Sequence, residues 1–83
     1  MIQTKADLDL AICLVFDSKD PDSDALFAFL NRTLKQFRLS QAYEARDILV
    51  EAYTRGVKQI EAGTPIRSLF PWFRRVSFNI ILE

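Results

Sequence analysis

Pro71 lies near the start of a long apolar segment, Leu69 to Leu82, and limits how that segment can fold. A proline is tolerated only in the first turn of a helix, because it has no backbone N–H and its ring clashes with the preceding turn. The last helix must therefore begin near Ser68, and we expect it to run from there to the C-terminus. Only three prolines and two glycines occur among the 83 residues, so few other positions interrupt the chain.

Two earlier segments repeat apolar residues with the 3.6-residue period of a helix. The first, Lys5 to Phe16, ends at an acidic stretch around Pro21. Its expected buried stripe consists of Leu8, Ala11, Ile12 and Val15, widened by Leu10 and Leu14. The expected stripe of the second helix consists of Leu26, Phe29, Leu30, Thr33, Leu34 and Phe37.

Serine and glycine mark the expected ends of these helices. Ser23 and Ser40 can each accept a hydrogen bond from a first-turn N–H, which predicts them as the N-caps of the second and third helices. The third helix is expected to run to about Ala62 and to end at Gly63, a favoured residue after a helix. The sequence therefore predicts an all-α fold, a compact bundle of about four helices.

The chain is long enough for one domain at most. A protein of this size buries only about 60–65% of its unfolded surface on folding, so a bare apolar face would leave it marginally stable. We therefore expect the first helix to pack on the bundle. Residues 1–22 are predicted to form an acidic N-terminal helix and linker, and residues 23–83 the helical domain proper.

Residue usage excludes several kinds of chemistry. The chain has no histidine and one cysteine, Cys13, so it can form neither an internal disulfide nor a histidine-based catalytic triad. The usual metal-ligand sets are also missing, and no cofactor is indicated. No apolar run approaches the roughly 20 residues that span a bilayer, and no signal segment opens the chain. We expect a cytoplasmic protein that is not an enzyme.

The net charge of zero hides an uneven distribution. Residues 1–24 carry six aspartates and two lysines, whereas the remainder carries nine basic and five acidic residues. The first part thus has a net charge of −4 and the rest +4. A basic region behind an acidic segment permits a polyanionic partner, but the same pattern can serve solubility alone.

The third helix has two faces of different character. Its expected buried face consists of Ala45, Ile48, Leu49, Ala52, Gly56 and Ile60. The opposite face mixes apolar side chains with carboxylates: Tyr43, Asp47, Val50, Glu51, Thr54 and Lys58. This mixture is typical of a docking patch for a basic, partly apolar partner, although the first helix could instead cover Tyr43 and Val50. Asp47 and Glu51 have no accompanying nucleophile or metal ligand, which argues against acid–base catalysis.

The last helix also carries more than a core stripe. Its expected core residues are Leu69, Trp72, Phe73, Val76 and Ile80, and the residues expected to point away are Arg74, Arg75, Phe78 and Leu82, with Asn79 at the edge. Arginines interleaved with an aromatic ring favour a surface for single-stranded nucleic acid, where guanidinium groups hold phosphates and rings stack on bases. Alternatively, Phe78 and Leu82 pack on the first helix or form a homodimer contact with a second copy.

Two motifs in this order resemble region two of bacterial RNA polymerase sigma factors, especially the compact extracytoplasmic-function type. The family has an Asp-x-x-Gln-Glu-x-aromatic motif on one helix, which Asp47 to Tyr53 matches except that Val50 stands in place of the glutamine. On the next helix the family has a Trp followed seven residues later by an Asn, as in Trp72 and Asn79. The resemblance covers about Leu26 to Asn79.

The resemblance implies a role in transcription initiation. In the family, the helix with the first motif binds a coiled coil in the clamp of RNA polymerase core, a role that would pass to Asp47, Val50 and Glu51. The loop before the Trp helix and the helix itself capture flipped bases of the single-stranded promoter −10 element. That DNA-binding role would pass by position to Gly63, Thr64, Pro65, Ile66, Arg67 and Asn79, with Arg74 and Arg75 as phosphate contacts.

A different class of function stays open from the sequence. The chain could be a protein-interaction or regulatory helical domain that dimerises or binds another transcription protein without contacting promoter DNA.

Overall fold

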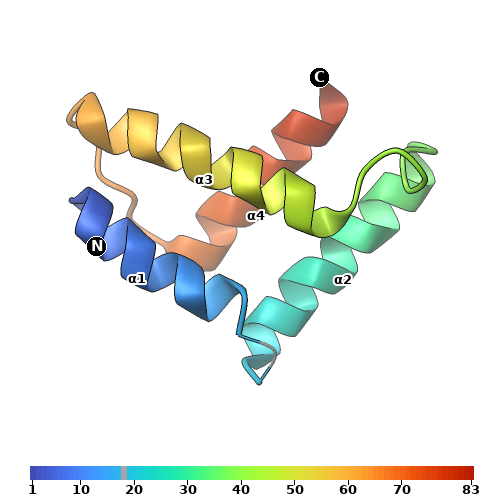
Figure 1. The fold of residues 1–83 in the computed structure, drawn as a ribbon, viewed down its shortest axis with the longest axis horizontal. Coiled ribbons are helices and arrows are strands. Elements are labelled where there is room, and N and C mark those ends of the chain that lie inside the picture. The colour runs from blue at the N-terminus through green and yellow to red at the C-terminus, as the bar shows by residue number, and fades with distance from the viewer. Residues whose placement is uncertain (18) are drawn as a thin grey trace.

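The computed structural model describes residues 1–17 and 19–83, which contain four helices (Figure 1). Their bounds are α1 Lys5–Val15, α2 Pro21–Gln36, α3 Ala45–Glu61 and α4 Leu69–Leu82. Across these described ranges the β-structure consists of one antiparallel bridge between Ile2 and Ile66. The predicted all-α fold is confirmed. None of the described helices is both long enough and apolar enough to cross a membrane.

α3 packs against all three other helices, and α4 packs chiefly against two of them. These two are α2 and α3, and in Figure 1 α4 crosses behind α3. α1 runs antiparallel to α3 and also contacts α2. The side chain of Phe73, on α4, is fully buried where these layers meet. The remaining buried apolar residues are Leu8, Val15, Leu26, Leu30, Leu34, Ala45, Ile48, Leu49, Ala52, Ile66, Trp72 and Ile81.

The N-terminus of α2 differs from the prediction. Asp20, not Ser23, is the N-cap, and its carboxylate accepts hydrogen bonds from the backbone N–H groups of Asp22 and Ser23. Pro21 then occupies the first helical position, where its missing N–H costs nothing. Ser23 is instead buried inside the first turn and donates its hydroxyl to the carbonyl of Val15. Ser18, in the acidic stretch before this helix, lies outside the described residues.

The start of α3 also differs from the prediction. Residues 40–42 form a turn, and α3 begins at Ala45 rather than after Ser40. A capping box explains this start, because Glu44 and Asp47 each accept a hydrogen bond from the backbone of the other. Two first-turn donors are thereby satisfied reciprocally, which a lone serine cannot do.

The predicted end of α3 is confirmed. Gly63 has a φ of 90°, in the left-handed region that favours glycine. The N–H of Gly63 donates to the carbonyl of Ile60 at 2.9 Å, and the N–H of Thr64 donates to Gln59 at 3.0 Å. This pair of bonds is the Schellman pattern, which satisfies the last carbonyls of the helix.

α1 is an integral part of the bundle, as expected. Its Leu8 and Val15 side chains have no exposed surface. The hydroxyl of Tyr53 on α3 donates to the Asp9 carboxylate, which also accepts from the Lys5 ammonium at 3.0 Å. These bonds lower the pKa of Asp9, chiefly through Tyr53, and raise that of the tyrosine.

The predicted widening of the α1 stripe is wrong. Leu10 is 74% exposed and Leu14 is 44% exposed, because they lie on the side of α1 away from Leu8 and Val15. The side of α1 next to α3 is occupied by the Asp9–Tyr53 bond and by Phe16, whose ring lies 5.6 Å from the guanidinium of Arg46.

Candidate nucleic-acid interface

A hollow of about 410 Å³ lies between the α3–α4 connection and the start of α4. We call it the loop hollow. It brings three of the predicted loop residues together with one of the predicted arginines of α4. Its lining consists of Gln59, Thr64, Pro65, Arg67, Ser68, Pro71, Trp72 and Arg75.

A chain of hydrogen bonds holds one wall of the loop hollow. The indole N–H of Trp72 donates to Oε1 of Gln59 at 3.2 Å, and Nε2 of Gln59 donates to the Pro65 carbonyl at 3.4 Å. Trp72 is only 5% exposed, so its ring is packed in the core while its polar edge reaches the loop. The glutamine amide thus links α3, α4 and their connection in one network.

The N-terminal segment holds the same connection from the other side. Ile2 and Ile66 exchange two backbone hydrogen bonds of 2.8 Å, and the Ile66 side chain is 1% exposed. Ile66 is therefore a core residue whose side chain and backbone polar groups are already occupied. A loop fixed in this way loses little entropy when it binds a ligand.

Some of the predicted DNA-binding residues line the loop hollow and others lie outside it. Arg67 and Arg75 are exposed and line the loop hollow. Asn79 is exposed one helical turn beyond Arg75, outside the lining of the hollow. Gly63 lies at the end of α3, where its positive φ closes the helix.

Arg74 lies outside the loop hollow, on the side of α4 next to α2. Its guanidinium carbon is 4.7 Å from the centre of the Phe29 ring on α2, a cation–π arrangement. It lines a larger hollow of about 840 Å³ between the two helices, which we call the α2/α4 groove. Sequence reasoning missed this groove because it assigned Phe29 to the core and gave Phe70 no role. The lining consists of Asp22, Ala25, Leu26, Phe29, Leu69, Phe70, Pro71, Arg74, Arg75 and Phe78.

The prediction that Phe78 points away from the bundle is wrong. Its ring is half-buried and lies 6.3 Å from that of Phe29 and 6.4 Å from that of Phe37, measured between ring centres. Phe37 itself is 41% exposed rather than buried, because it follows the last residue of α2. Of the two residues expected in a homodimer contact, Leu82 is the exposed one, at 53%.

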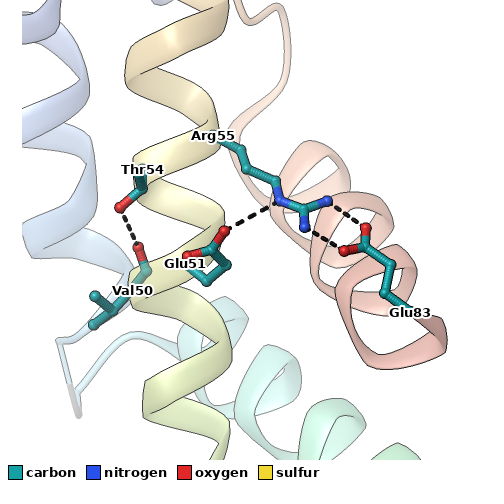
Figure 2. A network of polar contacts seen from close by, with 5 residues as sticks. All are labelled: Val50, Glu51, Thr54, Arg55 and Glu83. Carbon is teal, nitrogen blue, oxygen red and sulfur yellow. Dashed lines mark hydrogen bonds and ion pairs between the residues drawn. The ribbon is translucent and has the colours of Figure 1, made fainter.

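The α3 face, which we define as Asp47, Val50 and Glu51, is exposed (Figure 2 shows the last two). The Val50 side chain is 53% exposed, and Tyr43, in the connection before α3, is 50% exposed. The alternative that the first helix covers them is therefore wrong. Asp47 also belongs to the capping box, so its carboxylate already accepts a hydrogen bond from the backbone N–H of Glu44.

An ion-pair network borders the α3 face. Nε of Arg55 lies 3.4 Å from the Glu51 carboxylate. The two terminal nitrogens of Arg55 each donate to the Glu83 carboxylate at 2.6 Å (Figure 2). The guanidinium lowers the pKa of Glu83 through these bonds. Val50 points away from this network, so the α3 face presents an apolar side chain beside a partly engaged carboxylate.

Within residues 1–17 and 19–83, no group of three His, Cys, Asp or Glu side chains is placed to hold a metal ion. The linings of the two hollows offer guanidinium donors, hydroxyls and aromatic rings.

The comparisons with known proteins give no relative. No family model matches the chain, and no match was found among the curated proteins or the solved structures.

Proposed function

We propose that the chain is a sigma-like transcription initiation module that binds single-stranded promoter DNA of the −10 region and docks on the clamp coiled coil of RNA polymerase core. It acts as a non-enzymatic binding protein, in the cytoplasm where these partners are found. The observation that carries the proposal is the loop hollow, in which three of the loop residues singled out by the resemblance, Thr64, Pro65 and Arg67, adjoin Arg75 of α4.

The loop hollow has the groups that an unpaired nucleotide requires. Arg67 and Arg75 can each hold a phosphate, and arginine suits this task because its planar fork can make two parallel hydrogen bonds. The hydroxyls of Thr64 and Ser68 can each donate to or accept from a base edge. Removing a base from its stack and its pair costs free energy, and this cost is smallest when the strand is already single.

The α3 face supplies the proposed protein contact. Val50 is exposed beside Glu51, which suits a partner that combines an apolar side chain with a cation. The substitution of valine for the family's glutamine changes the chemistry of this contact from hydrogen bonding to apolar packing. The chain therefore lacks the side-chain hydrogen bonds that the family's glutamine can make at this position.

The DNA part of the proposal is tested by titrating a labelled single-stranded oligonucleotide at several salt concentrations. Arg75→Ala should weaken binding and reduce the slope of log affinity against log salt by about 0.7, the value for one phosphate contact on a single strand. Arg32→Ala is the matched control, because Arg32 is an exposed arginine on α2 outside both hollows. Equal affinity and slope in wild type and Arg75→Ala would refute the DNA proposal.

The role of Asn79 is tested by the same titration. An asparagine amide can pair with a base edge, so Asn79→Ala should reduce the preference among oligonucleotide sequences by about 1–3 kcal/mol and leave the salt slope unchanged. A changed slope with an unchanged preference would assign Asn79 to the backbone instead.

The polymerase part is tested with an isolated clamp coiled-coil fragment. Val50→Gln should strengthen binding of the fragment, because an amide can make hydrogen bonds across the interface that valine cannot. Val57→Gln, at a half-buried position on the same helix, controls for a general effect of the substitution on α3. Weaker or unchanged binding by Val50→Gln would count against docking in the family's manner.

The second candidate is a protein-interaction or regulatory domain without promoter contact. The observation that favours it is the exposure of Leu10, Leu14 and Val50, since exposed apolar side chains on neighbouring helices suit a protein partner. The two candidates are separated by the oligonucleotide titration, because only the first requires affinity for single-stranded DNA.

A further inference from the structure

We infer that the α2/α4 groove is a second base-binding subsite, which takes the nucleotide adjacent to the one in the loop hollow. This inference rests on the proposed function, because it extends the same DNA site. The ligand is a dinucleotide unit of a single strand, with one base in each hollow and the connecting phosphate on Arg75.

The first argument is that the two hollows are adjacent. Pro71 and Arg75 line both of them. These residues are one helical turn apart on α4, and they form a ridge with the loop hollow on one side and the groove on the other. A phosphate held by Arg75 would therefore have a binding space on each side.

The second argument is the aromatic character of the groove. Phe29, Phe70 and Phe78 contribute half-buried rings, one from α2 and two from α4. Rings of this kind stack on unpaired bases with little regard to sequence, since every base has a π face. The rings lie in a space of about 840 Å³, within the size range of small-molecule sites.

The third argument is charge. Arg74 lies against the Phe29 ring and is exposed, so its N–H groups are available to an anion at the rim. At the other end of the groove, Asp22 lies in the first turn of α2, which also contains Asp24. The acidic end repels a phosphate, and the basic rim attracts one. A nucleotide would therefore enter base first, with its phosphate on the side of Arg74 and Arg75.

The experiment compares oligonucleotides in which all but one or two adjacent positions are abasic. In the wild-type chain, a second adjacent thymine should strengthen binding by about fivefold or more, as expected for one stacked base. Phe70→Leu keeps an apolar side chain but removes the ring, so it should abolish this gain and leave the affinity for the one-thymine oligonucleotide within about twofold. Phe27→Leu is the control, because Phe27 is a half-buried phenylalanine on α2 that packs against Phe16 instead.

A variant that should strengthen binding separates the effect of the groove from a loss of binding through misfolding. Asp22→Asn removes a charge that repels phosphate, so it should strengthen binding of the two-thymine oligonucleotide more than that of the one-thymine oligonucleotide. Melting temperatures of all variants establish that the fold is kept.

The outcomes distinguish this inference from the function on which it rests. If no oligonucleotide binds the wild-type chain, the proposed function fails and the inference with it. If the one-thymine oligonucleotide binds but a second thymine adds nothing, only the groove inference is overturned. If Phe70→Leu lowers affinity for polymerase core and leaves both oligonucleotide affinities unchanged, the groove is a protein-docking site and the inference is likewise overturned.

Discussion

Gly56 offers the sharpest test of how the bundle is packed. It lies on the buried face of α3, where a Cβ atom would sit 3.0 Å from Cη2 of Trp72 and 3.1 Å from Cδ2 of Leu8. Alanine is favoured over glycine in a helix interior by about 1 kcal/mol. Overpacking a core typically costs about 1–3 kcal/mol. The Trp72 ring cannot yield without straining its hydrogen bond to Gln59, so we expect the packing cost to prevail.

Gly56→Ala should therefore lower the free energy of unfolding by about 1 kcal/mol, the difference between a packing cost of about 2 kcal/mol and the helix gain. In a domain of this size the melting temperature should fall by roughly 4–8 °C. Urea unfolding followed by circular dichroism measures the free energy directly. A variant more stable than wild type by about 1 kcal/mol would refute the reasoning, because it would mean that the helix gain is realised without a packing cost.

Three further predictions concern stability. Ser77→Ala should raise the free energy of unfolding by about 1 kcal/mol, as measured by urea unfolding, because the buried Ser77 hydroxyl has no hydrogen-bond partner among the described residues. Arg38→Gly should also stabilise, by about 0.5–1 kcal/mol in the same assay, because Arg38 has a φ of 59° and glycine adopts this conformation without strain. Tyr53→Phe should lower the melting temperature at neutral pH, and its difference from wild type should shrink in acid. The reason is that the Tyr53 bond lowers the pKa of Asp9, so its stabilisation is complete above the unfolded pKa of about 4 and is lost as the pH falls through the lowered value.

Strong local signals made the helices predictable from the sequence. Pro71 fixed the start of α4 within one turn, and Gly63 fixed the end of α3, because both residues restrict the backbone regardless of tertiary context. The buried face of α3 followed from its period. In α4, however, Ser77 and Ile81 are buried, whereas Val76 and Ile80 are only half-buried, so the true stripe is rotated toward α2. That rotation depends on how α4 lies between two neighbours, which no local pattern encodes.

The helix starts were less predictable because several residues compete to cap each one. Asp20 and Ser23 are both good caps, and the choice depends on the tertiary position of the carbonyl of Val15, which binds the Ser23 hydroxyl. At α3 the reciprocal bonds of Glu44 and Asp47 prevail over the single bond that Ser40 could make.

The candidate site was predictable in part. The resemblance pointed to the loop and to Arg75, which line one hollow, but it also included Ile66, whose side chain is buried. Burial of a loop isoleucine depends on the pairing of its backbone with Ile2, a contact between residues 64 positions apart. The α2/α4 groove could not be found from a single helix, because its rings come from two.

The most direct test of the central claim uses the only tryptophan of the chain. The Trp72 indole N–H gives one resolved signal in a nitrogen–proton correlation spectrum, and it belongs to the network that shapes the loop hollow. On titration with a single-stranded oligonucleotide, we predict that this signal shifts together with the backbone signals of Thr64, Arg67 and Arg75, while that of Val50 stays in place. Saturating oligonucleotide that leaves the indole signal and these backbone signals unmoved would contradict the account.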